Sequence, residues 1–111
     1  MSITTHVLDT SRGKPAAGVA LRLSLHENGS WRELAHGTTD ADGRCKSLLS
    51  PGPLAVGTYR LAFEVAAYFV AHAVESFYPM VSIDFVVKDA AAHYHVPLLL
   101  SPWGYSTYRG S

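Results

Sequence analysis

The chain has 111 residues, of which 48% are hydrophobic and 16% are charged, which is enough for one compact domain and not comfortably for two. Nine basic and nine acidic side chains give a formal net charge of zero, so a nucleic-acid-binding surface is a poor explanation of the sequence. Because the charged fraction is low for a monomer of this size, we expect part of the surface to be buried in a homo-oligomer.

Three features of the sequence predict a cytoplasmic protein that does not insert into a membrane. Residues 1–6 contain neither the basic nor the apolar region of a secretory signal. The longest apolar stretch, around Val65 to Ala71, is far too short to span a bilayer. The single cysteine, Cys45, excludes an internal disulfide framework and fits a reducing compartment.

Short segments with β-strand character alternate with turn signals along the chain. In chain order, the expected strands are Thr5–Leu8, Val19–Leu25, Trp31–Leu34, Tyr59–Val65, Ser82–Val87 and His95–Leu100. The turn signals are Gly13-Lys14-Pro15, Asn28-Gly29, Asp42-Gly43, Pro51-Gly52-Pro53, Val56-Gly57 and Pro102-Trp103-Gly104. The one credible helix is short, from about Ala66 to Ala73. This pattern predicts an all-β sandwich in a single domain over residues 1–111.

The Asn28-Gly29 dipeptide predicts the first hairpin, because two-residue turns of this composition match the twist of the strands they join. Apolar residues alternate with other residues in the strand before it. Val19, Leu21, Leu23 and Leu25 would therefore lie on one buried face.

Three histidines lie in or beside predicted strands. His6 belongs to the first strand, and His93 and His95 flank Tyr94 near the last one. If that segment is extended, both imidazoles share one face of the sheet while Tyr94 points to the other. Histidine is well suited to moving protons near neutral pH, so these residues are candidates for acid–base catalysis. The alternative is ordinary surface or core histidine, which is our interpretation of His26, His36 and His72.

Other chemistries have weaker support in the sequence. His6, His93 and His95 could in principle supply three nitrogens to zinc, but no Cys-x-x-Cys or His-Glu-x-x-His motif accompanies them. The absence of a Gly-x-Ser-x-Gly turn disfavours a nucleophilic serine. Glycine motifs that cradle phosphate are also absent, and the weak spacing of the histidines leads us to expect no metal.

Arg44 follows an Asp-rich turn, Thr39 to Gly43, which lacks the remaining ligand positions and the terminal Glu of a calcium loop. Arg44 is either a solvated residue at a strand edge or a residue whose planar guanidinium binds a planar, oxygen-rich ligand.

The C-terminal segment, residues 104–111, is rich in aromatic and hydroxyl side chains. It is either a frayed edge strand or a tail inserted into an interface or pocket. The second alternative would place Arg109 and a terminal carboxylate in that pocket.

Three segments from the beginning, middle and end of the chain form a recognisable set. The first is Thr5-His6-Val7-Leu8-Asp9 followed by Gly13-Lys14-Pro15-Ala16. The second is Thr39-Asp40-Ala41-Asp42-Gly43-Arg44. The third runs from His93 to Pro102 and continues to Tyr108-Arg109-Gly110-Ser111. Their order and spacing resemble the transthyretin-like family over essentially the whole chain. The terminal Tyr-Arg-Gly-Ser resembles the 5-hydroxyisourate hydrolase branch rather than the hormone-carrying transthyretins.

The resemblance implies a transthyretin-like (prealbumin-like) β-sandwich of about eight strands with one short helix. It also implies a homotetramer, built as a dimer of dimers, with active sites in the channel at the dimer–dimer interface. The implied reaction converts 5-hydroxyisourate, a product of urate oxidation, to 2-oxo-4-hydroxy-4-carboxy-5-ureidoimidazoline without a cofactor. The implied catalytic residues are His6, Arg44 and His95, and the implied substrate-binding residues are Tyr108, Arg109, Gly110 and Ser111.

The roles of these residues follow from what ring opening requires, namely an activated water, a stabilised oxyanion and a held substrate. His6 and His95 would share the proton transfers, with the choice of base left open. Arg44 would bind carbonyl oxygens and the developing negative charge. His93 would support the site or the strand. The sequence departs from the family pattern at Met80 and Trp103, outside this set, where only packing or channel shape would change.

Two other functions remain as alternatives. A non-catalytic carrier would bind a small aromatic ligand in the channel of the same tetramer, but carriers replace the residues implied to be catalytic, and all of them are present here. A structural β-sandwich module without a chemical site would leave the three motifs unexplained.

Overall fold

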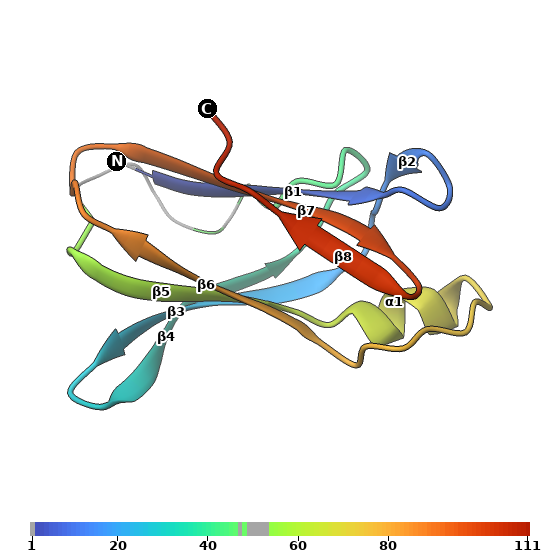
Figure 1. Cartoon of the computed structure of the whole chain (residues 1–111), viewed down its shortest axis with the longest axis horizontal. Coiled ribbons are helices and arrows are strands. Elements are labelled where there is room, and N and C mark those ends of the chain that lie inside the picture. Colours follow the sequence, from blue (N-terminus) through green and yellow to red (C-terminus); the bar gives the residue numbers. More distant parts are fainter. Residues whose placement is uncertain (1, 47, 49–53) are drawn as a thin grey trace.

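Two four-stranded sheets pack face to face and enclose the hydrophobic core (Figure 1). The computed structural model describes residues 2–46, 48 and 54–111. Within this part of the chain there are eight strands and one short helix, which agrees with the all-β sandwich of about eight strands that the family resemblance implies. The turn signal at Pro51-Gly52-Pro53 lies outside the described residues.

The first sheet has the strand order β2-β1-β7-β8. Its strands are β1 (Ser2–Asp9), β2 (Lys14–Pro15), β7 (His93–Ser101) and β8 (Gly104–Thr107). The first strand pairs with β7 in parallel over its full length, from the Ser2–His93 pair to the Asp9–Leu100 pair. This pairing joins the two ends of the sequence, and no local pattern predicts it.

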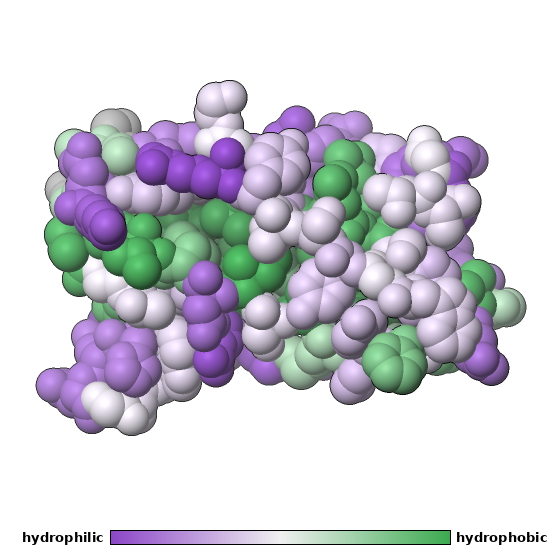
Figure 2. Space-filling model, in the orientation of Figure 1, coloured by the Kyte–Doolittle hydropathy of each residue, from purple (hydrophilic) through white to green (hydrophobic). Residues whose placement is uncertain are grey.

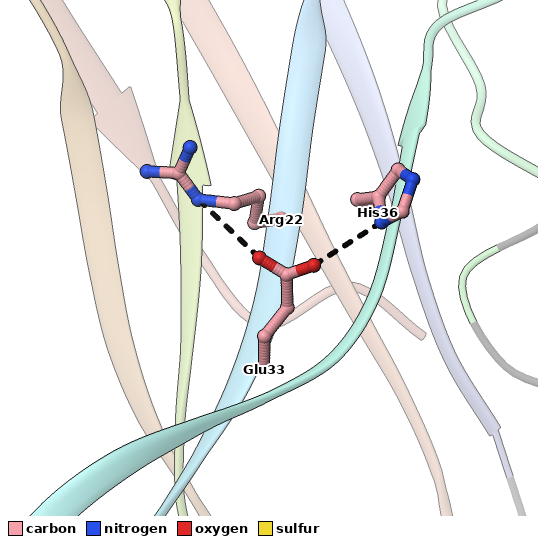
Figure 3. Close-up of polar contacts among 3 residues, drawn as sticks. All are labelled: Arg22, Glu33 and His36. Carbon is pink, nitrogen blue, oxygen red and sulfur yellow. Dashed lines mark hydrogen bonds and ion pairs between the residues drawn. The ribbon is translucent and has the colours of Figure 1, made fainter.

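The second sheet has the strand order β4-β3-β5-β6. Its strands are β3 (Ala20–Glu27), β4 (Ser30–Thr38), β5 (Gly57–Phe63) and β6 (Val81–Val87). The hairpin between β3 and β4 is confirmed, with Asn28 and Gly29 both at positive φ (54° and 79°) as its tight turn requires. Polar side chains cover part of the outer face of this sheet, where Glu33 contacts Arg22 at 3.8 Å and His36 at 3.1 Å (Figure 3).

The core forms where the inward faces of the two sheets meet. The predicted buried face of Val19, Leu21, Leu23 and Leu25 is confirmed, since each of these residues is at most 5% exposed. In β1 and β7 the buried residues also alternate with half-buried or exposed ones, because successive side chains of a strand point to opposite faces. Each of these strands therefore offers one face to the core and the other to the outside.

The helix α1 (Val65–Ala71) lies at one end of the sandwich (Figure 1). The predicted range of Ala66 to Ala73 is too late at its C-terminal end. Ala73 adopts a left-handed φ of 56°, and the Val74 N–H donates to the Phe69 carbonyl, which closes the helix. The predicted strand Tyr59–Val65 is likewise too long, because Val65 begins this helix. In the described part of the chain, no helix is long and apolar enough to cross a membrane.

Candidate active site

The outer face of the first sheet gathers polar side chains from β1 and β7. Ser2, Thr4 and His6 alternate with buried residues of β1, so all three point away from the core. His93 and His95 do the same on β7, with the Tyr94 side chain buried between them in sequence. The prediction that these two imidazoles share a face is confirmed, and their rings lie nearly parallel with centroids 6.5 Å apart.

The register between β1 and β7 decides which of these side chains become neighbours. Ser2 pairs with His93, Thr4 pairs with His95, and His6 pairs with Pro97. His95 therefore lies beside Thr4, one position along the same face from His6.

Arg44 reaches this face through the turn that precedes it. The Asp40 carboxylate accepts hydrogen bonds from the backbone N–H groups of Asp42 and Arg44, and the Asp40 N–H donates to the Arg44 carbonyl at 2.8 Å. These bonds fold the chain so that Arg44 forms an antiparallel bridge with His6. Gly43 makes this approach possible, because it has a φ of +77° and a Cβ there would collide with the Val7 carbonyl oxygen.

The C-terminal segment returns to the same place. Residues Gly104–Thr107 form β8 against β7, and the Gly110 N–H then donates to the His95 carbonyl at 2.8 Å. A Cβ on Gly110 would lie 2.5 Å from Cδ2 of His95, so the tail backbone packs directly against the imidazole. The first part of this segment is thus an edge strand and its end contacts His95, whereas insertion into an interface or pocket stays a prediction.

A chain of hydrogen bonds runs across the polar face. Thr4 Oγ1 lies 2.8 Å from His95 Nδ1 and 3.1 Å from His93 Nε2. Ser2 Oγ lies 2.6 Å from His93 Nδ1. A threonine hydroxyl has one proton and two lone pairs, so Thr4 donates to at most one of the two imidazoles and accepts from the other or from both. The ring orientations of both histidines are thereby coupled.

The electrostatic environment favours the neutral form of His95. Burial lowers the pKa of His95 below its usual value of 6.5, and the charges of Arg44, His6 and His93 lower it further. These contributions place Arg44 and His6 within electrostatic range of the imidazole. At neutral pH, His95 is therefore suited to accept a proton next to a permanent positive charge.

The remaining predicted site residues lie less close to the imidazoles. The Arg109 guanidinium lies over the Tyr94 ring at 4.5 Å and donates to the His93 carbonyl at 3.4 Å. Because Tyr94 points to the core side of β7, Arg109 stacks on the opposite side of this strand from the rings of His93 and His95. Tyr108 and Ser111 are exposed, and they stay predicted site residues without an observed contact to the histidines.

Tyr108 and Arg109 also line an open pocket of about 240 Å³ between β6 and the β7–β8 edge. Its floor is apolar, and Figure 2 shows hydrophobic residues exposed between the two sheets on this side of the molecule. None of the catalytic candidates lines this pocket, so its position does not mark the proposed chemistry.

Two residues of the polar face, Ser2 and Thr4, were not singled out from the sequence. Thr4 lies two residues before His6, which puts both on one side of a strand, and this spacing was the only available signal. Within the described residues, no group of three or more His, Cys, Asp or Glu side chains is arranged to hold a metal ion.

Comparison with known proteins supports the family resemblance that the sequence motifs indicate. The profile of the HIUase/Transthyretin family matches residues 3–110. A 5-hydroxyisourate hydrolase of Mus musculus is 50% identical over 111 residues, which cover 98% of this chain and 94% of that protein.

Solved structures of a hydrolase and of a transthyretin both share this fold. The 5-hydroxyisourate hydrolase of Klebsiella pneumoniae has a TM-score of 0.85 and 42% identity, covering 98% of each chain. Sea bream transthyretin in complex with thyroxine has a TM-score of 0.91 and 32% identity, covering 97% of this chain and 93% of the other. The backbone thus matches both kinds of protein, and the sequence identity is higher to the hydrolases. The chain belongs to the HIUase/Transthyretin family.

Proposed function

We propose that this protein hydrolyses 5-hydroxyisourate to 2-oxo-4-hydroxy-4-carboxy-5-ureidoimidazoline. The observation that carries the proposal is the convergence of His6, Arg44 and His95 from three separate segments on one outer face of the sheet. Relatives that match nearly the whole chain at up to 50% identity bear the name 5-hydroxyisourate hydrolase. Together, the chemistry of the face and the names of the relatives favour a hydrolase over a carrier.

The proposed reaction begins with water attack on a ring carbonyl of the planar substrate. His95, held neutral by its surroundings, takes a proton from the water, and His6 orients the water or shares this role. The Arg44 guanidinium binds carbonyl oxygens and stabilises the negative charge that develops on the attacked oxygen. The ring amide is activated by its neighbouring carbonyls, so the proposal requires no cofactor.

Substrate would be held by the tail together with the polar face. The Gly110 backbone packs against the His95 ring, which fixes one wall of the site. Tyr108, Arg109 and Ser111 flank Gly110 in sequence, and we propose that they contribute to substrate binding, Arg109 from the Tyr94 side of β7. We propose that residues 1–111 form a single domain and that its site lies in the channel at the dimer–dimer interface.

We also propose a homotetramer that is a dimer of dimers. Among the described strands, β6 and β8 lie at the edges of their sheets, and large apolar side chains are exposed on and near them. Val86 is 52% exposed and Tyr108 is 57% exposed. A second copy of the chain is the partner that the family membership favours.

A cytoplasmic location remains our prediction, based on the single cysteine. Cell fractionation followed by immunodetection would test it. We propose neither nucleic acid nor a membrane as a partner.

The proposed activity is tested by generating 5-hydroxyisourate from urate with urate oxidase and following its ultraviolet decay. Wild-type protein should accelerate the decay, and His95→Ala should lower kcat by about 100-fold or more, the scale of one acid–base group. His36→Gln is the matched control, because His36 lies on β4 of the other sheet and should leave the rate unchanged. Decay at the spontaneous rate with folded wild-type protein would reject the hydrolase and favour a carrier.

A further inference from the structure

The Thr4 hydroxyl lies between the imidazoles of His93 and His95 and within hydrogen-bond distance of both. The two rings are nearly parallel, with an interplanar angle of 13°. His95 is half-buried, whereas His93 is exposed and contacts Ser2 at its far nitrogen. These contacts form a path that begins at His95, passes through Thr4 and His93, and ends at Ser2 on the exposed surface.

We propose that Thr4 is a positioning residue that relays protons between His95 and the exposed His93. The proposal rests on the hydrolase function proposed above. In one arrangement, His95 carries its proton on Nδ1 and donates to Thr4, whose own proton is donated to His93 Nε2. The His93 Nδ1–H then donates to Ser2 Oγ, and His95 Nε2 is left as a free acceptor that faces the substrate.

Proton uptake by His95 exchanges the donor and the acceptor in the hydrogen bonds that link His95, Thr4 and His93. When water attacks, one water proton moves to His95 Nε2, and the Nδ1 proton moves to Thr4 Oγ1. The hydroxyl proton of Thr4 moves to His93 Nε2, and His93 releases its Nδ1 proton to solvent beside Ser2. His95 is neutral again and now carries its proton on Nε2.

The second half of the reaction restores the first arrangement. As the ring C–N bond breaks, the His95 Nε2–H gives its proton to the leaving nitrogen. His95 Nδ1 then takes the Thr4 proton, Thr4 takes the His93 Nε2 proton, and His93 takes one proton from solvent. One proton leaves and one enters through the relay, while the water oxygen and its other proton form the carboxyl group, which ionises at neutral pH.

The charges around His95 explain why a relay is useful. Arg44, His6 and His93 all disfavour a positive charge on the half-buried His95, and the other nearby cation, Arg109, stacks on the far side of β7. Moving the charge to the exposed His93 places it in water, where charge is stabilised. Without the Thr4 hydroxyl, protonated His95 could not pass its proton to His93, and its positive charge would remain beside Arg44.

Two variants of Thr4 test the relay. Thr4→Val keeps the β-branched shape and removes the hydroxyl, whereas Thr4→Ser keeps the hydroxyl. We expect Thr4→Val to lower kcat at least tenfold with KM changed less than threefold, and Thr4→Ser to stay within threefold of wild type. His36→Gln again serves as the unaffected control.

A second measurement separates a relay from a merely structural role. His93→Phe removes the group that passes protons to solvent, so kcat should fall. Added imidazole should accept these protons and raise the kcat of His93→Phe, whereas the kcat of wild type should not depend on imidazole. Nitrogen NMR without substrate should show a changed balance of the two neutral tautomers of His95 in Thr4→Val, because Nδ1 loses its hydrogen-bond partner. Active wild type with unchanged kcat and an unchanged tautomer balance in Thr4→Val would overturn the relay alone. An inactive wild type would instead reject the hydrolase function.

Discussion

His95 illustrates how one residue acquires its properties from several distant segments. Thr4 of β1 binds one ring nitrogen, the Gly110 backbone packs against the ring, and Arg44 contributes a positive charge from a separate turn. Burial and positive neighbours act in the same direction on a histidine, because both disfavour the charged imidazolium. The neutral form is therefore available as a base at neutral pH.

Replacing Arg44 by Met should raise the pKa of His95 toward its usual value of 6.5, because one of the positive charges that lower it is removed. At a pH below 6.5, less of the imidazole would then be neutral, and an acid limb of the rate that depends on the neutral form would move to higher pH. The measurement is an NMR titration of the His95 ring without substrate. Arg12→Met, at the far end of β1, should leave the titration unchanged, and an unaltered His95 titration in Arg44→Met would contradict the prediction.

The end of β1 is fixed to the helix by one buried carboxylate. Asp9 is 1% exposed, and its oxygens accept hydrogen bonds from the Tyr68 hydroxyl at 2.7 Å and from the Ser11 hydroxyl and N–H. Burial by itself would raise the pKa of Asp9, but these bonds and one from the Arg12 N–H outweigh it and hold the pKa below the ordinary 3.8. The strand that bears Thr4 and His6 is thereby anchored at its last residue.

Asp9→Asn should lower the free energy of unfolding at pH 7 by about 1–3 kcal/mol, because charge-assisted hydrogen bonds from Ser11 and Tyr68 are lost. A lowered carboxyl pKa stabilises the folded state above the unfolded value of about 3.9, and this contribution is lost as the pH falls through the folded pKa. Urea unfolding at pH 7 and pH 3 checks this. Tyr68→Phe removes only one bond and should cost less. An equal difference between wild type and Asp9→Asn at both pH values would refute the explanation.

At the scale of the whole molecule, the sandwich leaves apolar surface uncovered. Val86 on β6 and Tyr108 after β8 border the open pocket, and Phe77 and Trp103 are 66% and 61% exposed near the β7–β8 hairpin. Their rings lie 6.2 Å apart, and the Phe77 N–H donates to the Pro102 carbonyl, so the two loops form one surface. Contiguous apolar surface of this kind is typical of association between subunits.

Light scattering after gel filtration should therefore give a mass about four times the 12.0 kDa of the chain. Val86→Glu should reduce this mass at low protein concentration, because a charge on the β6 edge opposes association. Val70→Glu is the matched control, since Val70 is 75% exposed on α1, away from this edge. A wild-type monomer at micromolar concentration would contradict the tetramer.

Sequence patterns predicted six of the eight described strands, the buried face of β3, the Asn28-Gly29 hairpin and the shared face of His93 and His95. Each of these depends on residues that are neighbours along the chain, where side-chain alternation and turn chemistry act directly. Strand β2 was expected to be part of a turn, and β8 was one of two alternatives for the C-terminal segment. The family motifs also identified His6, Arg44 and His95 as candidates. The helix end at Ala73 was misplaced, because a left-handed alanine has no distinctive local signal.

The tertiary structure alone decided how these residues meet. Thr4 and His95 are 91 residues apart, and only the parallel register of β1 against β7 makes them hydrogen-bonded neighbours. Arg44 joins them because Gly43 allows its turn to approach the Val7 carbonyl, and Gly110 packs against His95 from the segment that follows β8. Sequence patterns fix which face of a strand a side chain takes, but pairing between distant strands arises from the combined packing and backbone hydrogen bonding of the whole fold.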